Sequence, residues 1–242
     1  MAWVAGLISV NTSAQTEADP SGQWKSPAVV VPGKLFPDGT LTAPSDAIVL
    51  FDGKDLLQFE STRGGDAKWE VKDGIMTIPA KAGDIRTRQK FNDIQLHIEW
   101  RIPVNAEGSG QHRGNSGIYL QGHYEIQILD SYQNETNYFG QAASVYSQMP
   151  PLVNAMKEPG EWNTYDILYT APTFKSDGTY RTRPVVTVLL NGVLVQYNTP
   201  ILGITYKDHK GYPPGEAHGS GPILLQDHNS PVSFRNIWIR EL

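Results

Sequence analysis

Residues 124–129 read Tyr-Glu-Ile-Gln-Ile-Leu, and their alternation is typical of a β-strand with one apolar face. Successive strand side chains point to opposite sides of a sheet, so the tyrosine and both isoleucines share a face that resembles core. Glu125 and Gln127 share the opposite face with Leu129. A carboxylate beside an amide on a rigid strand can bind a polar ligand and can also act as a base. The pattern therefore predicts a binding surface on this strand.

A second carboxylate for ordinary glycoside hydrolysis is missing from that face. Retaining glycosidases need two carboxyl groups about 5–5.5 Å apart. Glu125 is followed on its face by Gln127 and Leu129, whereas Asp130 has the opposite parity unless the strand ends or bulges before it. The spacing disfavours an ordinary retaining glycosidase and leaves Glu125 as a single base.

His228 follows Gln226 and Asp227 at the end of a predicted strand, directly before a turn. The unperturbed pKa of histidine suits proton transfer near neutrality. On spacing alone, a solvated turn in which Asp227 caps its own backbone is the simpler interpretation.

Other side chains suit sugar binding but have simpler alternatives. Arg86 and Arg88 lie two residues apart and can hold an oxyanion or sugar hydroxyls, although surface arginines are commoner. Asn115 is a turn residue or a ligand. Aromatic residues that can stack on sugars, or simply pack in a core, are Tyr119, Tyr132, Tyr138, Tyr146 and Trp162.

Short alternating segments joined by turns predict an all-β protein. Strands are expected at 47–51, 94–101 and 162–169, and closing strands at 221–228 and 232–242 around a turn at 229–231. Hairpins are expected at the Asp-Gly pair 73–74 and the Asn-Gly pair 191–192. Long loops are expected at 104–114, 133–160 and 203–221. No segment has the periodicity of an amphipathic helix, so the prediction is a single β-sandwich.

Composition excludes several classes of function. The 242 residues carry a formal net charge of −5, without a Lys/Arg run that would suit nucleic acid or a membrane surface. There is no cysteine, so disulfides and thiolate chemistry are excluded. No phosphate loop, nucleotide fingerprint or His-Glu-x-x-His motif occurs, so no nucleotide cofactor is expected. Loops rich in Asp and Asn can hold Ca²⁺, although no twelve-residue calcium loop is present.

The N-terminal part differs from the rest of the chain. Residues 1–14 are apolar and end in small residues, as in a secretory signal that lacks its basic start, and they are too short to span a membrane. Residues 15–45 contain repeated prolines and read as an extended lead-in to a domain at 46–242. We expect a secreted or periplasmic protein.

Several segments together resemble the 3-keto-disaccharide hydrolase family, long catalogued as a domain of unknown function. The resemblance covers about residues 46–242. It implies an exported sandwich of the concanavalin A-like (LamG-like) jelly-roll type that acts on glycosides already oxidised to a ketone at C3. The matching segments are Leu-Phe-Asp-Gly-Lys-Asp-Leu at 50–56, Trp-Glu-Val-Lys-Asp-Gly at 69–74, Asn-Ser-Gly-Ile-Tyr at 115–119, and residues 124–132, 160–163, 221–228 and 234–240.

The implied chemistry needs only one well-placed base. A C3 ketone acidifies the C2–H bond, so a base can remove that proton, the aglycone can leave C1, and water can add to the enone. The resemblance implies that Glu125 is the base or a metal ligand and that His228 relays protons. A divalent metal such as Ca²⁺ or Mn²⁺ remains open. The implied substrate-binding residues are Arg88, Asn115, Gln127, Asp130, Tyr146, Trp162 and Gln226.

Alternatives remain at this point. A non-catalytic carbohydrate-binding module would use the same face, an ordinary glycosidase would need the missing acid, and a structural role is a third. The resemblance is compatible with lyase, hydratase or net hydrolase activity. Residues 174–183 are an insertion relative to the family and are expected to lengthen a hairpin. The expected partner is an oligosaccharide or glycoside substrate, with the oligomeric state left open.

Overall fold

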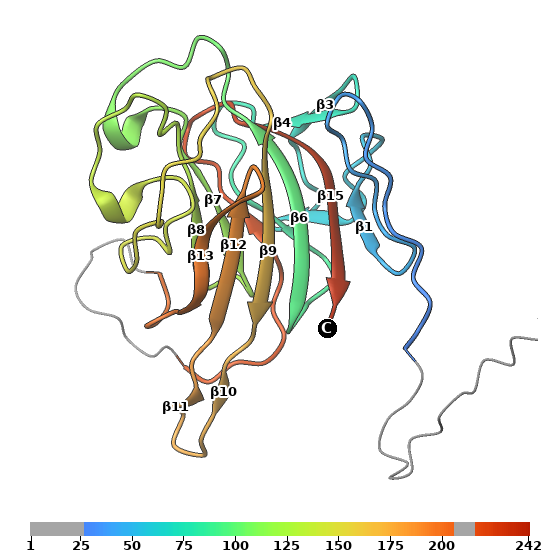
Figure 1. Ribbon diagram of the computed structural model, residues 1–242, viewed down its shortest axis with the longest axis vertical. Helices are drawn as coiled ribbons and strands as arrows, with labels where there is room; N and C mark the ends of the chain where they lie inside the picture. Colours follow the sequence, from blue (N-terminus) through green and yellow to red (C-terminus); the bar gives the residue numbers. More distant parts are fainter. Residues whose placement is uncertain (1–26, 206–215) are drawn as a thin grey trace, which may run out of the picture. The chain divides into compact units, whose positions relative to one another are not determined.

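Two antiparallel sheets enclose a single apolar core in the computed structural model, which describes residues 27–205 and 216–242 (Figure 1). Residues Val31–Leu242 form one compact unit. The larger sheet follows the order β13 (Val193–Pro200), β12 (Val185–Leu190), β9 (Asn163–Thr170), β6 (Ile94–Arg101), β15 (Ser233–Glu241), β4 (Ile75–Thr77) and β3 (Glu70–Lys72), with β1 (Ile48–Phe51) also paired to β15.

The smaller sheet carries the stretch singled out in the sequence. Its order is β2 (Phe59–Ser61), β5 (Ile85–Thr87), β14 (Leu224–Leu225), β7 (Ser116–Leu120) and β8 (Tyr124–Ile128). The helical content of the described residues is two short 3₁₀ turns, η1 (Gly110–His112) and η2 (Tyr138–Gly140). The predicted all-β sandwich of the jelly-roll type is confirmed.

The alternation along the strands explains how the core forms. In β8 the tyrosine and both isoleucines are fully buried and belong to the core cluster, together with inward-facing residues of β6, β9 and β12. Burial of apolar side chains on the inner faces of both sheets holds the layers together. The opposite face of β8 is therefore free to carry Glu125 and Gln127.

Both predicted tight hairpins are present. Asp73 and Gly74 connect β3 to β4 with φ values of 51° and 78°, and Asn191 and Gly192 connect β12 to β13 with 54° and 78°. Two successive residues with positive φ define a type I′ turn, whose twist matches that of the flanking strands.

Strand β6 is buried on both faces. A strand with this alternation usually leaves its polar face in solvent, yet His97 and Glu99 on the polar face are 2% and 1% exposed. The ring of His97 stacks on Trp238 of β15 with centroids 5.0 Å apart, and Glu99 accepts hydrogen bonds from Arg235 and Asn236. Side chains of β15 thus cover the polar face of β6.

The closing strands do not form a hairpin. Of residues 221–228 only Leu224 and Leu225 are in a strand, and this strand belongs to the smaller sheet, whereas β15 belongs to the larger one. The expectation of a long strand at 221–228 is therefore wrong. The ladder ends because Asp227 donates its backbone N–H to Asp84 Oδ1 at 2.8 Å. The following turn crosses from one sheet to the other.

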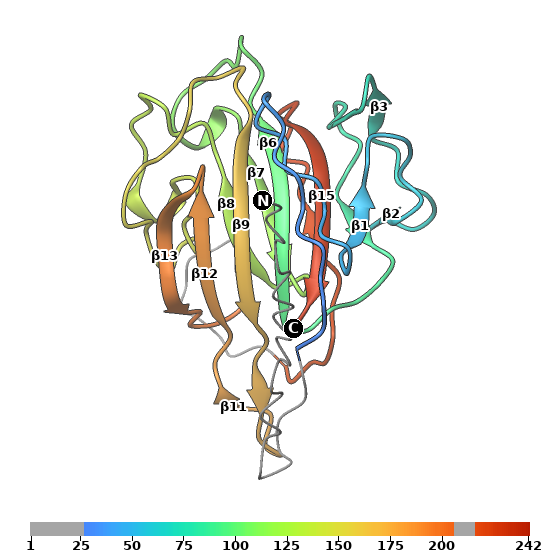
Figure 2. The ribbon, with the colours of Figure 1, turned by 45° about the vertical axis from the view of Figure 1, so that its right-hand side comes forward.

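Residues 174–183 lengthen a hairpin, as predicted. Strands β10 (Thr173–Phe174) and β11 (Tyr180–Thr182) pair with each other beyond the ends of β9 and β12 and project from the sandwich (Figures 1 and 2).

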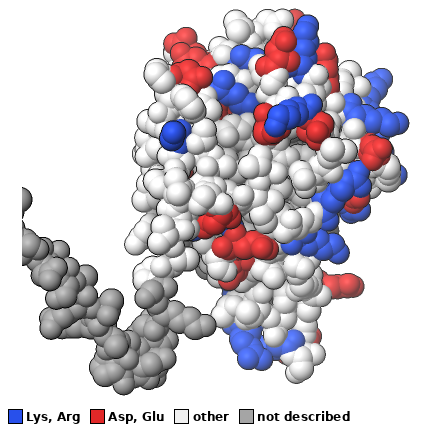
Figure 3. All heavy atoms as spheres, turned by 90° about the vertical axis from the view of Figure 1, so that its right-hand side faces the viewer, with Lys and Arg blue, Asp and Glu red and all other residues white. Residues whose placement is uncertain are grey.

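Residues 31–45 belong to the compact unit with the sandwich. Leu35 and Leu41 form an isolated β-bridge, and Asn236 Nδ2 donates to the carbonyl oxygen of Leu41 at 2.7 Å. The predicted signal-like segment 1–14 and the first part of the lead-in lie outside the described residues. Within the described ranges, no helix has the length and apolar character needed to cross a membrane. Acidic and basic side chains intermix on the face shown in Figure 3.

Candidate active site

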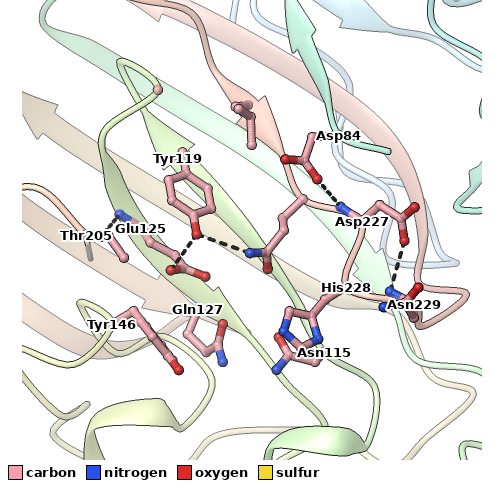
Figure 4. Close-up of a pocket in the computed structure, with 13 residues that line it drawn as sticks. Asp84, Asn115, Tyr119, Glu125, Gln127, Tyr146, Thr205, Asp227, His228 and Asn229 are labelled. Carbon is pink, nitrogen blue, oxygen red and sulfur yellow. Dashed lines mark hydrogen bonds between the residues drawn. The ribbon is translucent and has the colours of Figure 1, made fainter. Parts of the chain in front are cut away.

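A cavity of about 640 Å³ lies on the outer face of the smaller sheet (Figure 4). Its lining is mostly polar and comes from β7, β8 and the segments beside β5 and β14. The lining residues are Asp84, Asn115, Tyr119, Gly122, Glu125, Gln127, Tyr146, Thr205, Leu224, Gln226, Asp227, His228 and Asn229.

Strand register brings these side chains to one face. Tyr119 of β7 pairs directly with Glu125 of β8, and Gly117 pairs with Gln127. Leu224 of β14 pairs with Tyr119 on its other side. Because residues directly opposite in a ladder point to the same face, the pairing gathers side chains from three strands around Glu125.

Glu125 is the buried carboxyl group of this cavity, with 3% of its surface exposed. Burial raises its pKa to about 8, the hydrogen bond that Tyr119 donates to Oε2 at 2.8 Å opposes this shift, and the charge of Asp84 adds to it. Burial, above all, also raises the pKa of Tyr119, so its hydroxyl remains protonated. A carboxyl group with such a pKa can both accept and return a proton near neutral pH.

Gly117 makes room for this carboxyl group. A Cβ atom added at position 117 would lie 2.4 Å from Oε1 of Glu125, well inside van der Waals contact. The glycine is therefore required by the placement of Glu125 rather than by backbone strain.

We expect Gly117→Ala to lower turnover at least ten-fold, because the methyl group must displace the Glu125 carboxyl group and misplacement of about 1 Å is costly in catalysis. The matched control is Gly219→Ala, since an added Cβ there meets nothing within 4 Å. Steady-state kinetics of both variants check this, and equal activity of Gly117→Ala and wild type would contradict it.

The other two carboxyl groups of the cavity are occupied by backbone donors. Asp227 Oδ2 accepts from the N–H of Gly83 at 2.8 Å, and its Oδ1 accepts from the N–H of Asn229 at 2.9 Å. Asp84 Oδ1 accepts from the N–H of Asp227. The predicted cap by Asp227 on its own turn is therefore present, and this turn also brings His228 to the cavity.

Two amide side chains complete the floor. Gln127 is fully buried, and its Nε2 lies 3.1 Å from Gln111 Oε1. Turning this amide over would bring Nε2 within 3.3 Å of Glu125 Oε1 and 2.8 Å of the Ser116 carbonyl oxygen. Asn115 Nδ2 donates to the Gln111 carbonyl oxygen at 2.7 Å. Figure 4 shows Glu125 and Tyr119 on one side of the cavity, with Asn115 and His228 on the other.

Most of the residues selected from the sequence meet in this cavity. Both predicted catalytic residues line it, and so do four of the substrate-binding candidates. These residues are Glu125, His228, Asn115, Gln127, Tyr146 and Gln226.

Arg88 and Asp130 lie outside the lining, because each is held in an ion pair elsewhere. The guanidinium of Arg88 is 2.7 Å from Asp66 and 3.4 Å from Glu60 on the surface. Asp130 is fully buried, with its Oδ2 2.7 Å from Arg113 Nε.

Trp162 also lies outside the lining. The guanidinium groups of Arg101 and Arg235 lie 4.6 Å and 4.3 Å from the centroid of its ring. These cation–π contacts compete with any sugar for the indole.

Other lining residues escaped sequence reasoning. Tyr119 appeared only among stacking or core aromatics, although its parity opposite Glu125 follows once the 117–127 hairpin is placed in register. Asp84 and Thr205 reach the cavity from segments far away in the sequence, and no local signal marks them.

Metal-binding geometry is absent from the part of the chain that the structure describes. Within residues 27–205 and 216–242, no group of three or more His, Cys, Asp or Glu side chains is arranged to hold a metal ion.

The lining residues form a polar cavity on the smaller sheet of an antiparallel β-sandwich. Residues 46–240 match the family model of the 3-keto-alpha-glucoside-1,2-lyase-like domain. The chain belongs to this family.

Relatives agree with this assignment. The chain is 27% identical to a 3-keto-disaccharide hydrolase of Bacteroides thetaiotaomicron, over 84% of this chain and 82% of that protein. A candidate glycosyl hydrolase of Parabacteroides distasonis, known as a crystal structure, is 58% identical with a TM-score of 0.87, over 90% of this chain and 93% of that one. A second such structure from the same organism is 25% identical with a TM-score of 0.60, over 81% and 94%.

Proposed function

We propose that this protein cleaves the glycosidic bond of 3-keto-glycosides, including 3-keto-disaccharides, by elimination across C1 and C2. The family supports the substrate class. The observation that carries the mechanism is the buried Glu125, whose carboxyl group has a pKa near 8 and lines a polar cavity.

Glu125 suits the role of base better than the other carboxyl groups do. Both oxygens of Asp227 and one of Asp84 accept backbone hydrogen bonds, which fixes these side chains in structural roles. Glu125 Oε2 accepts from the Tyr119 hydroxyl, and Oε1 faces the space left by Gly117, with the turned-over Gln127 amide 3.3 Å away. One oxygen therefore remains to take a proton.

In the proposed reaction, Glu125 Oε1 removes the C2 proton, and the electron pair delocalises onto the C3 carbonyl oxygen as an enolate. The pair then returns to form the C1–C2 double bond as the C1–O bond breaks. The leaving aglycone oxygen takes up a proton, which His228 relays. Addition of water to this enone, with –OH at C1 and –H at C2, gives net hydrolysis.

An amide group in the cavity would stabilise the developing charge. Asn115 Nδ2 donates one N–H to Gln111, and its second N–H can bind the enolate oxygen or a sugar hydroxyl. Both N–H groups of the fully buried Gln127 have protein acceptors, so this side chain supports the floor. Preorganised donors of this kind lower the barrier because they need no rearrangement as charge appears.

The proposal is tested by incubating the purified protein with a 3-keto-glycoside and with its unoxidised parent, with and without EDTA, while following aglycone release. Release from the keto compound alone is expected. Binding of both compounds without cleavage would instead identify a carbohydrate-binding module, and cleavage of the parent would identify an ordinary glycosidase. Loss of activity in EDTA would add a metal to the mechanism.

The pH profile should follow Glu125. A base must be deprotonated to act, so kcat/KM should rise with pH and level off above about 8, the pKa of this carboxyl group. Initial rates at saturating and limiting substrate from pH 5 to 10 check this. A profile already flat at pH 6 would contradict the assignment of Glu125.

A further inference from the structure

A hydrogen-bonded chain crosses three neighbouring strands at the floor of the cavity. Gln226 Nε2 donates to Tyr119 Oη at 3.2 Å, and Tyr119 Oη donates to Glu125 Oε2 at 2.8 Å. Gln226 follows β14, Tyr119 belongs to β7 and Glu125 to β8, so the sheet itself fixes their spacing.

The direction of this chain is set at its carboxylate end. In the ionised form of Glu125, which is the form that acts as a base, the carboxylate can only accept hydrogen bonds, so the single hydroxyl proton of Tyr119 is committed to Glu125. The hydroxyl oxygen can then only accept from its other neighbour, and Gln226 must present its NH₂ group.

An otherwise unexplained feature of Gln226 follows from this direction. Its Oε1 atom is buried and has no hydrogen-bond partner among the described residues. A buried polar atom without a partner costs stability. Turning the amide over would place Oε1, in the position of Nε2, against the Tyr119 hydroxyl. That alternative would point an oxygen at Tyr119, which has no second proton to donate. The direction of the hydrogen-bonded chain therefore explains why Gln226 Oε1 has no partner among the described residues.

The two oxygens of Glu125 consequently differ. Oε2 ends the hydrogen-bonded chain and accepts from Tyr119 at 2.8 Å, whereas Oε1 lies beside Gly117, and turning over the Gln127 amide would give it only a longer contact of 3.3 Å. A proton on Oε2 would point at the hydroxyl proton of Tyr119, which already occupies that direction. Protonation is therefore directed to Oε1.

We propose that Tyr119 and Gln226 are positioning residues that hold Oε2 of Glu125 as a hydrogen-bond acceptor and leave Oε1 to exchange the proton with the substrate. This inference rests on the proposed function of Glu125 as base. Gln226 then acts through Tyr119 rather than by contact with the sugar.

The test is a ¹³C NMR titration of the Glu125 carboxyl group in wild type, Tyr119→Phe and Gln226→Leu, combined with pH-dependent kinetics. In Tyr119→Phe we expect the titration midpoint and the acid limb of kcat/KM to move up by about 1 to 2 pH units, because a hydrogen bond to a charged group has that effect. Gln226→Leu should move both in the same direction by less, with little change in KM.

The control is Tyr132→Phe, which removes a tyrosine–glutamate hydrogen bond of 2.9 Å to the exposed Glu158 and should leave the Glu125 titration unchanged. A raised KM in Gln226→Leu with an unmoved titration would overturn the proposal in favour of direct substrate binding. If Tyr119→Phe does not fold, the Gln226→Leu titration alone decides. A wild type without any activity would refute the proposed function, whereas the titration would still test the chain.

Discussion

Replacement of Glu125 by glutamine is expected to lower kcat for aglycone release by about 10²–10⁴-fold, the usual contribution of a general base. The amide has nearly the same shape as the carboxyl group and can still accept from Tyr119, but it cannot take the C2 proton. Because Glu125 has no cationic partner among the described residues, the substitution leaves no buried positive charge, and the fold should remain intact.

This result is checked by steady-state kinetics and by isothermal titration with a 3-keto-glycoside. Substrate affinity should change far less than kcat, since the cavity is retained. The matched control is Glu158→Gln, because Glu158 is exposed and accepts from Tyr132 on the surface. Full activity of Glu125→Gln would refute the proposed base, whereas loss of activity in both variants would point to a non-specific effect.

The second large effect concerns stability, and we expect Glu99→Gln to lower the free energy of unfolding by about 3–5 kcal/mol. Glu99 is 1% exposed and accepts from Arg235 Nε at 2.6 Å and Asn236 Nδ2 at 2.7 Å, with His97 Nε2 3.7 Å away. Its removal leaves the positive charges of His97 and Arg235 without their buried partner.

The pH dependence of unfolding identifies this network. Burial by itself lowers the pKa of His97, but hydrogen bonds to Asp166 and Glu99 outweigh it and raise the pKa to about 9. The stability that comes from protonated His97 is therefore complete below its unfolded pKa of 6.5 and is lost as pH rises through about 9. In Glu99→Gln the folded-state pKa of His97 falls, so this loss of stability should be smaller and should be complete at a lower pH.

Urea unfolding of wild type and Glu99→Gln between pH 6 and 10 measures both effects. The control is Glu60→Gln, because Glu60 pairs with Arg86 and Arg88 on the surface, and exposed ion pairs contribute at most about 1 kcal/mol. Equal destabilisation by the two substitutions would show that burial of Glu99 is not the cause.

The sequence predicted those parts of the site that depend on local alternation. The parity of residues 124–128 placed Glu125 and Gln127 on one face, and the two glycine-containing turns were recognisable from their φ requirements. Residues whose position depends on long-range pairing were not predictable in this way. Asp84 reaches Asp227 across 143 residues, through a contact between segments that carry no mutual signal.

Burial of polar residues was the other source of error. The polar face of β6 looked like solvent-facing surface, because alternation alone does not reveal that charged neighbours can cover it. Similarly, Arg88 and Trp162 have side chains suited to sugar binding, but the fold supplies each with nearer partners. Residue type indicates what a side chain can bind, whereas the surrounding charges decide what it does bind.

The two-residue period of β8 also determines where this chain can change in length. Insertion or deletion of one residue within Tyr124–Ile128 would exchange the two faces, placing a carboxylate in the core and isoleucines in the cavity. The β10–β11 hairpin is not paired with β8, so it can be shortened or extended without changing the face to which Glu125 points. Related chains should therefore vary in their projecting hairpins, while the number of residues between Tyr119 and Gln127 remains constant.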